Sequence, residues 1–279
     1  MNDAPVRVPP AWLALREPAD AAARDADLAA VLVRHAPPSG RWVIHDLACG
    51  TGSMGRWLAP LLPGPQHWVL HDRDPDLLEI AAHDAPSGAA DGAPVTVETR
   101  RSDITGLDAA ALAGVSLVTA SALLDILSGW ELARLLAVLR EAECPVLLAL
   151  SVTGRVALDP PHHLDIRVAR AFNAHQRRPT SRGRLLGPDA PTATAAGLRR
   201  PGWEVHVRPS PWRLDAADGA LVAEWFAGWV GAAVEQEPEL AETLEEYERW
   251  RLAAAADGVL AVTVQHADVL AVPAVEVPA

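Results

Sequence analysis

The sequence predicts an α/β fold, a doubly wound and mostly parallel sheet of seven strands, with a helical cap before it and a helical insertion near its end. Short apolar runs alternate with helical patterns between residues 42 and 151, which is typical of parallel strands covered on both faces. The first run ends in a glycine-rich turn, GTGSMG. A chain of 279 residues that is 50% hydrophobic can also bury a core of this size.

The N-terminal stretch, residues 1–40, predicts the helical cap. A turn that carries a tryptophan precedes a helix beginning at Pro18, and the helix stops at the Pro-Pro-Ser-Gly run that ends at Gly40. The remaining residues, 41–279, form the main domain in this interpretation.

The sequence of the main domain predicts strands and helices in regular alternation up to Ser151. Strands are expected at 42–47, 67–71, 95–99, 115–120, 145–151, 203–208 and 259–264, and early helices at about 53–62, 75–83 and 130–142. After Ser151 we expect a long loop at 152–163, a helix at 164–178 and, at 179–202, an irregular stretch with at most one short helix. Two helices, 216–234 and 239–256, predict an insertion at about 215–257 before the last strand.

Composition narrows the function. A net charge of -12 repels phosphate backbones, so a nucleic-acid partner is disfavoured. We expect a cytoplasmic protein without a membrane partner, because we find neither a signal peptide nor an apolar run near the roughly 20 residues of a membrane span. The chain contains no lysine, which excludes Schiff-base chemistry. Its two cysteines have no metal-ligand spacing, so no metal is expected.

The glycine turn allows three interpretations. A phosphate loop requires a lysine and is excluded. A dinucleotide site fits the GxGxxG pattern of residues 50–55 and the carboxylate of Asp72 about 20 residues later. However, Asp46 stands four residues before Gly50, where its charge would repel a pyrophosphate and attract a cation. A ligand that carries a cation therefore fits the turn better.

Four stretches, in order, resemble the motifs of the class I S-adenosylmethionine-dependent methyltransferases. HDLACGTG is similar to the first motif, an acidic residue followed by xGxGxG, with Ala48 in place of the first glycine. The others are HWVLHDRDPDLLEIA, RRSDIT and VTASALLDILS, which look like the second motif, the third motif and the fourth strand with its loop. The resemblance covers residues 40 to 152 and implies a Rossmann-like methyltransferase fold with S-adenosylmethionine as cofactor.

The resemblance also implies a set of cofactor-binding residues. Asp46 would lie near the amino group of the methionine moiety, and Asp72 would accept hydrogen bonds from the ribose hydroxyls. The complete set is Asp46, Ala48, Gly50, Gly52, Asp72, Arg73, Asp103, Ile104, Ser121 and, from the cap, Arg16.

The resemblance assigns the other residues of this set to the adenine of the cofactor, to the tip of the fourth strand and to the cap. Asp103 would accept a hydrogen bond from the adenine amino group, although it also fits an ordinary helix N-cap. Ile104 would flank the ring, and Arg73 would pack along it unless it is simply solvated. Ser121 would lie at the tip of the fourth strand, and Arg16 would contact the cofactor carboxylate as the cap closes.

The methyl acceptor should lie over the ends of the fourth and fifth strands, where in-line transfer needs alignment and, for some acceptors, a base. Asp125 follows the fourth strand, and His162 and His163 follow the fifth. We take these three as candidate catalytic residues, with a purely structural role for the histidines as the alternative. Two adjacent histidines without a third ligand do not indicate a metal site.

The arginine-rich residues 167–213 precede an acidic helical insertion. These two segments either complement one another or include arginines, Arg182 and Arg184 in particular, that bind an anionic small molecule. An aromatic stripe in the insertion, Trp225, Phe226 and Trp229, indicates a core or the interface of a homodimer.

The sequence thus predicts a methyltransferase that acts on an oxygen, nitrogen or carbon of a small molecule. Three alternatives stay open at this point: an RNA methyltransferase, an NAD-binding Rossmann protein, and a module that binds S-adenosylmethionine without catalysis.

Overall fold

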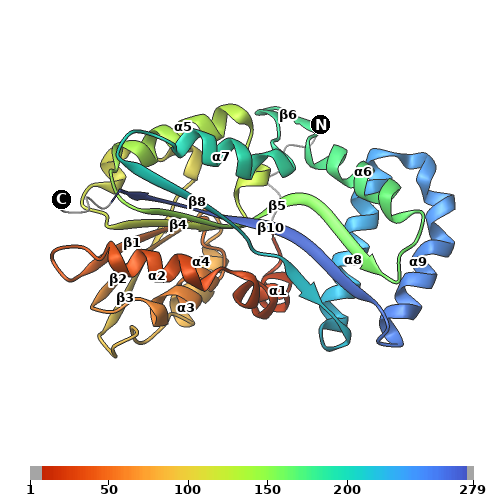
Figure 1. Cartoon of the computed structure of the whole chain (residues 1–279), viewed down its shortest axis with the longest axis horizontal. Helices are drawn as coiled ribbons and strands as arrows, with labels where there is room; N and C mark the ends of the chain where they lie inside the picture. The colour runs from red at the N-terminus through yellow and green to blue at the C-terminus, as the bar shows by residue number, and fades with distance from the viewer. Residues whose placement is uncertain (1–7, 275–279) are drawn as a thin grey trace.

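The computed structural model describes residues 8–274 and is organised around one twisted sheet (Figure 1). The strand order is β3-β2-β1-β4-β5-β10-β8, and β9 pairs with β10 outside this path. The bounds of these strands are β1 Trp42–Leu47, β2 Gln66–Asp72, β3 Val95–Arg101, β4 Leu117–Ser121, β5 Val146–Asp159, β8 Trp203–Pro209, β9 Trp212–Leu214 and β10 Ala261–Pro273.

The first five strands of the sheet are parallel. In β1, Ile44 pairs with Trp68 of β2 on one side and with Leu117 of β4 on the other. The last strand, β10, is antiparallel and lies between β5 and β8. The predicted doubly wound, mostly parallel sheet of seven strands is confirmed, and short β9 joins it as an eighth strand.

Helices cover both faces of the sheet, as the alternating pattern predicts. On one face lie α2 (Ala26–Arg34), α3 (Ser53–Leu58) and α4 (Pro75–His83), and on the other lie α5 (Gly129–Glu141) and α7 (Ala190–Leu198) (Figure 1). Each face has its own buried apolar cluster. No helix within residues 8–274 is both long enough and apolar enough to cross a bilayer.

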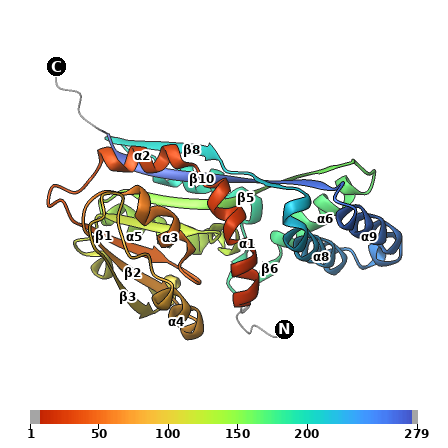
Figure 2. The same cartoon turned by 90° about the horizontal axis from the view of Figure 1, so that it is seen from below.

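Strands β5 and β10 continue beyond the other long strands as a ribbon, and short β9 pairs with β10 along it. Asp159 at the end of β5 pairs with Ala261 at the start of β10. Figure 2 shows the ribbon reaching the helices α6 (Asp165–Gln176), α8 (Gly219–Gln236) and α9 (Ala241–Ala256). These helices enclose a third apolar cluster with the ribbon.

The prediction of a loop at 152–163 is therefore wrong for residues 152–159. Val152, Val156 and Leu158 alternate with more polar or smaller residues, but the stretch contains a glycine and has no strand partner nearby in the sequence. Its partner is residues 261–266, about a hundred residues later. Only that long-range pairing makes it a strand.

Where the sequence predicted one N-terminal helix, the described residues form two, α1 (Pro10–Ala23) and α2; residues 1–7 of the expected cap lie outside the described residues. Pro10 occupies the first turn of α1, where a proline is well tolerated, and Pro18 lies inside the helix. The side chain of Asp25 accepts hydrogen bonds from the backbone N–H groups of Asp27 and Leu28, and so begins α2. The expected helix start at Pro18 is thus wrong, because Pro10 and Asp25 provide the two starts.

A small hairpin was also missed by the sequence patterns. Strands β6 (Pro179–Thr180) and β7 (Gly183–Arg184) form a separate two-stranded sheet. Leu185, just after the hairpin, bridges to Ser128 at the start of α5.

Candidate functional site

The turn that follows β1 adopts a backbone conformation that most side chains avoid. Ala48, Gly50 and Gly52 have φ angles of 52°, 56° and 85°. A Cβ atom on Gly52 would lie 3.2 Å from the Cβ of Ala81 in α4. The turn is therefore held close to α4 and leads directly into α3.

Asp46 is a buried carboxylate at the end of β1. Its Oδ1 accepts a hydrogen bond of 2.8 Å from the Thr119 hydroxyl on β4. Its Oδ2 is buried and has no hydrogen-bond partner among residues 8–274. Burial raises the pKa of Asp46 to about 7, although the Thr119 hydrogen bond and the charge of Arg24 act in the opposite direction. This oxygen is an acceptor that a cationic donor would complete.

Asp72, at the end of β2, ties the glycine turn to the neighbouring strand. Its Oδ2 accepts a hydrogen bond of 2.9 Å from the backbone N–H of Gly50, and its Oδ1 accepts one of 2.9 Å from the N–H of Asp74. A carboxylate oxygen can accept more than one hydrogen bond. Asp72 can therefore also accept hydrogen bonds from two neighbouring hydroxyl groups.

Asp103 begins the short 3-10 helix η2 (Ile104–Gly106). Its Oδ1 accepts hydrogen bonds from the N–H and the hydroxyl of Thr105, at 2.9 Å and 2.8 Å. The backbone hydrogen bond is the main cause that lowers the pKa of Asp103, and the charge of Arg73 contributes. The N-cap role that the sequence allowed is thus present. Ile104 beside it is half-buried against the apolar cluster of that face.

Ser121, at the end of β4, has a partner that the sequence patterns did not indicate. The buried guanidinium of Arg24 donates to the hydroxyls of Ser53 and Ser121, at 3.0 Å and 3.1 Å. Arg24 follows the last residue of α1, so it carries a positive charge to the point where the glycine turn meets β4. Burial lowers the pKa of Arg24, and nearby Asp20 and Asp46 oppose that effect.

Arg16 lies in α1, before Arg24, and its guanidinium binds side chains of the protein. It forms a two-pronged ion pair with buried Asp20, at 2.9 Å and 3.1 Å. Its guanidinium also lies over the ring of Trp212, 5.0 Å from the centroid. The Trp212 indole N–H completes this arrangement by donating to Asp20.

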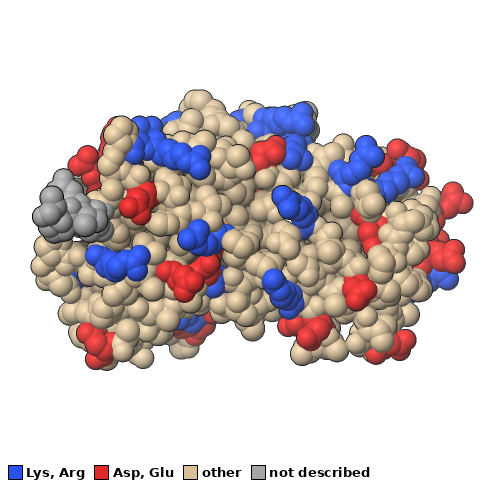
Figure 3. Space-filling model, in the orientation of Figure 1, with Lys and Arg blue, Asp and Glu red and all other residues tan. Residues whose placement is uncertain are grey.

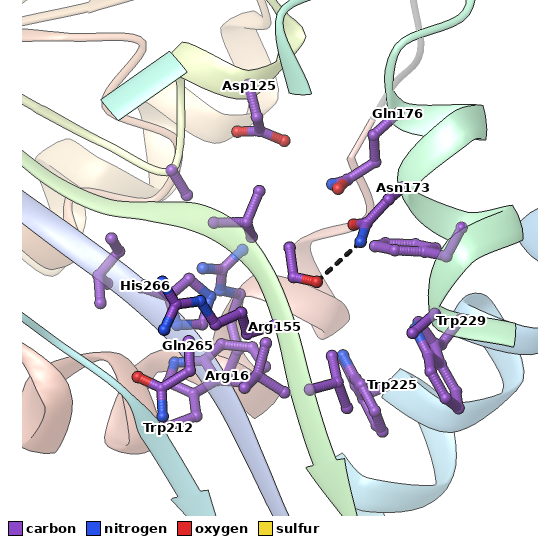
Figure 4. Close-up of a pocket in the computed structure, with 18 of the residues that line it drawn as sticks. Arg16, Asp125, Arg155, Asn173, Gln176, Trp212, Trp225, Trp229, Gln265 and His266 are labelled. Atoms are coloured by element: carbon purple, nitrogen blue, oxygen red, sulfur yellow. Dashed lines mark hydrogen bonds between the residues drawn. The ribbon is translucent and has the colours of Figure 1, made fainter. Parts of the chain in front are cut away.

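A cavity of about 270 Å³ lies along β5, beyond the end of β4 (Figure 4). Its walls are rich in tryptophan: Trp12 comes from α1, Trp212 from β9, and Trp225 and Trp229 from α8. Side chains of this kind exclude water and favour flat apolar ligands.

Polar side chains also line this cavity. Asp125 lies in the short 3-10 helix η4 (Leu124–Ile126) that follows β4, Asn173 and Gln176 come from α6, and His266 comes from β10. Burial raises the pKa of Asp125 to about 6 and lowers the pKa of His266 to about 4. At neutral pH, Asp125 is therefore ionised and His266 is uncharged.

A structural relative supports the fold. No protein-family model and no curated protein matches the sequence. Among solved structures, the chain is similar to a candidate type II methyltransferase from Anaeromyxobacter dehalogenans, with 18% identity and a TM-score of 0.51 over 89% of this chain and 96% of that one. The chain has the class I methyltransferase fold.

Two further solved structures are similar over most of their length. One is a cyclopropane-fatty-acyl-phospholipid synthase-like protein from Lactobacillus casei, with 17% identity, 91% of each chain covered and a TM-score of 0.49. The other is the YcgJ protein from Bacillus subtilis, with 13% identity, 91% of this chain and all of that chain covered, and a TM-score of 0.47. Both TM-scores lie below 0.5, so the fold assignment does not depend on them.

On this methyltransferase fold, His162 and His163 do not line the cavity. The sequence placed them in a loop after a strand that ends at Ser151, but β5 runs to Asp159, which is about 26 Å further at roughly 3.3 Å per residue. The ring of His162 packs against Tyr247 of α9, with centroids 5.0 Å apart. This contact fits the alternative interpretation, in which the histidines have a purely structural role.

Arg182 and Arg184 are exposed in the β6–β7 hairpin and are likewise absent from the cavity wall. Arg182 forms an ion pair of 2.9 Å with Glu131 of α5. Other arginines of this segment are also paired, for example Arg177 with Asp189 at 2.6 Å. On the face drawn in Figure 3, arginines form separate patches with acidic residues among them.

Several cavity residues of this methyltransferase fold were missed or given another role. Trp225 and Trp229 were expected in a core or a dimer interface; Trp229 is buried within the chain's own third cluster and also reaches the cavity. Ala169, Phe172, Asn173 and Gln176 occupy one face of α6 at i, i+3, i+4 and i+7. The two amide side chains lie on the same helical face as the phenylalanine, and this pattern could have predicted that the face lines a cavity.

Proposed function

We propose that this chain transfers a methyl group from S-adenosylmethionine to a small-molecule acceptor bound in the tryptophan-lined cavity. The observation that supports this most directly is the position of the cavity. Ala122 and Asp125, which line it, come one and four residues after Ser121 at the end of β4. In an open α/β sheet, ligands bind beyond the carboxyl ends of the strands near the switch in strand order, which here lies between β1 and β4.

The residues around the glycine turn fit S-adenosylmethionine. The unpartnered Oδ2 of Asp46 suits its ammonium group, because a buried carboxylate oxygen is completed best by a cation. Asp72 suits the ribose hydroxyls, and Asp103 and Ile104 suit the adenine. Bound there, the cofactor would supply a methyl group activated by a sulfonium.

The side chains of the cavity would position the acceptor and receive its proton. Trp212 and Trp225 restrict the acceptor and exclude water from it. Asp125 is the candidate base, because it is the titratable residue of the cavity wall that follows β4 most closely in the sequence and it is ionised above a pH of about 6. No histidine is required for this role.

Calorimetry with S-adenosylhomocysteine tests the cofactor site. We expect micromolar binding, and a loss of at least tenfold in affinity for both Asp46→Ala and Asp72→Ala. Asp257→Asn, an exposed change at the end of α9, is the matched control and should bind like the unaltered chain. Binding of NADH without binding of S-adenosylhomocysteine would overturn the proposal.

Methyl transfer itself is tested by release of S-adenosylhomocysteine over a panel of small molecules. Turnover that Trp225→Leu reduces, with cofactor affinity unchanged, supports an acceptor in the cavity. Tight cofactor binding with no turnover of any acceptor would favour the non-catalytic module instead.

A further inference from the structure

Four buried polar atoms around the cavity have no hydrogen-bond partner among the described residues. They are Asn173 Oδ1, Gln176 Oε1, Trp229 Nε1 and His266 Nδ1. Ten such atoms occur in residues 8–274, so four of the ten belong to residues that line this one cavity. Buried polar groups are nearly always satisfied. Their concentration here indicates that a bound molecule supplies the missing partners.

The α6 wall offers hydrogen-bond acceptors in particular. The amide of Asn173 is oriented by its Nδ2, which donates a hydrogen bond of 2.8 Å to the carbonyl of Gly154. This leaves Oδ1 as the free group of that amide. One helical turn later, the carboxamide of Gln176 extends toward the space below Asp125 (Figure 4). Asn173 Oδ1 therefore requires a hydrogen-bond donor on the ligand, and a second donor would satisfy Gln176 Oε1.

The aromatic side chains define the shape of the ligand. Trp225 stacks on Trp229, with centroids 5.3 Å apart and ring planes 18° apart, and Trp12 meets Trp212 edge to face at 6.5 Å. Two tryptophan pairs from different elements favour a flat ring. The volume of about 270 Å³ is just below the roughly 300–1,000 Å³ of pockets for drug-sized ligands, so it suits a small ring system.

The charges of the wall favour an uncharged ligand. Arg16 is neutralised by its ion pair with Asp20, and His266 is uncharged at neutral pH because burial lowers its pKa. Of the remaining ionised groups of the wall, the carboxylate of Asp125 would repel an anion and the guanidinium of Arg155 would repel a cation, so neither sign of ligand charge is favoured. Arg182 and Arg184, which the sequence offered for an anionic ligand, lie outside this wall.

We infer that the cavity takes an uncharged aromatic molecule that carries at least two hydrogen-bond donors, with hydroxyarenes as the matching chemical class. The inference rests on the proposed function, because it takes the occupant of the cavity to be the methyl acceptor. Catechol is the smallest probe with these features, and 1,2-dimethoxybenzene is its matched analogue without donors.

The test measures binding of both probes by calorimetry to the full chain saturated with S-adenosylhomocysteine. We expect catechol to bind at least tenfold more tightly than 1,2-dimethoxybenzene, because only catechol can satisfy the α6 amides. Gln176→Leu should weaken catechol at least fivefold and leave the affinity for S-adenosylhomocysteine unchanged. Gln236→Leu, an exposed change on α8, is the control and should alter neither affinity.

The outcomes separate this inference from the proposed function. Equal or tighter binding of 1,2-dimethoxybenzene would show that donors are not recognised and would overturn the inference. Cofactor binding without binding of either arene would overturn it as well, while the proposed function stands. The comparison of the two probes uses the unaltered chain, so it holds even where a variant folds poorly. Failure to bind S-adenosylhomocysteine would overturn both.

Discussion

The Arg24 guanidinium donates a hydrogen bond of 3.1 Å to the Ser121 hydroxyl and so joins the end of α1 to the end of β4. The same buried cation lowers the pKa of Asp46, while burial raises that pKa to about 7. The charge state of the carboxylate at the glycine turn therefore depends on a residue of the cap. Two of the predictions below follow from this relationship.

The affinity for S-adenosylhomocysteine should depend on the protonation of Asp46. Below a pH of about 7 the carboxylate is protonated and loses its attraction for the ligand's ammonium, and above it the carboxylate is ionised. We expect affinity to rise by up to about tenfold per pH unit below 7 and then to level off. Calorimetry from pH 5.5 to 8.5 measures this. Asp46→Asn should give a weak and flat profile, and an equally steep profile in that variant would contradict the assignment.

Replacing Arg24 should shift that profile to higher pH. Arg24→Met keeps an apolar chain of similar length but removes the cation that favours ionised Asp46. At pH 7, affinity for S-adenosylhomocysteine should fall by roughly tenfold, and it should partly recover at pH 8.5. The exposed Arg34→Met in α2 is the control. A loss that is the same at every pH would mean that Arg24 acts by direct contact alone.

Asp125 should titrate at an unusually high pH for an aspartate. Burial raises its pKa to about 6, with the charge of Arg16 acting in the opposite direction. The carboxylate can accept a proton only when it is ionised, so kcat/KM should rise with pH up to about 6 and then level off. Asp125→Asn should lower kcat by about 10²–10⁴-fold for an acceptor that must lose a proton.

A readout that needs no acceptor is available for the same residue. The carboxyl 13C resonance of Asp125 is identified by its absence from the spectrum of Asp125→Asn. In the unaltered chain this resonance should titrate near pH 6. Catechol should displace its midpoint, whereas 1,2-dimethoxybenzene should not. A midpoint near 4 would show that Asp125 is solvated like an ordinary surface aspartate.

The ion pair between Arg251 and Asp165 should hold the distal helices together. Fully buried Arg251 donates to both oxygens of Asp165 at 2.6 Å, and the Tyr247 hydroxyl donates to the same carboxylate. Asp165→Asn leaves the guanidinium buried without a counter-charge, so it should cost about 3–5 kcal/mol in the free energy of unfolding. Urea denaturation measures the loss. Exposed Glu242→Gln should change stability by less than about 0.5 kcal/mol.

The glycine turn should respond unequally to substitution at two of its positions. Gly52→Ala places a Cβ 3.2 Å from Ala81 at a φ of 85°, so it should destabilise the chain by about 1–3 kcal/mol. At Ala48, relief of left-handed strain, worth about 1–2 kcal/mol, is offset by the entropy of glycine and the lost methyl group. Ala48→Gly should therefore change stability by less than about 1 kcal/mol. Thermal melting of both variants checks this contrast.

Local sequence patterns were sufficient to predict the half of the fold that contains the glycine turn. The runs WVIHDL and HWVLH became β1 and most of β2 because both strands are buried on both faces and need continuous apolar residues. Asp46 and Asp72 lie at the same edge of the sheet because β1 and β2 are parallel, and the backbone N–H of Gly50 donates to Asp72 there. For these residues, order along the chain nearly determines position in space.

The cavity was harder to predict because its walls are joined by long-range contacts. Trp12 and Trp212 are two hundred residues apart in sequence, and they meet only because α1 packs on β9. The extension of β5 depended on pairing with β10, and the misplacement of His162 followed directly from missing it. The role of Arg24 could not be predicted, because nothing in the sequence of an alanine-rich helix end indicates that its guanidinium is buried.

Helix α1 is a wall shared by two compartments. Leu13 lies 3.2 Å from the position that a Cβ on Gly50 would take, and Glu17 forms an ion pair of 2.6 Å with Arg56 beside the glycine turn. From the same helix, Trp12 and Arg16 line the cavity. A movement of α1 that uncovers the turn also removes part of the cavity wall. In the proposed function, the exchange of the cofactor and the departure of the product would then both depend on this one helix.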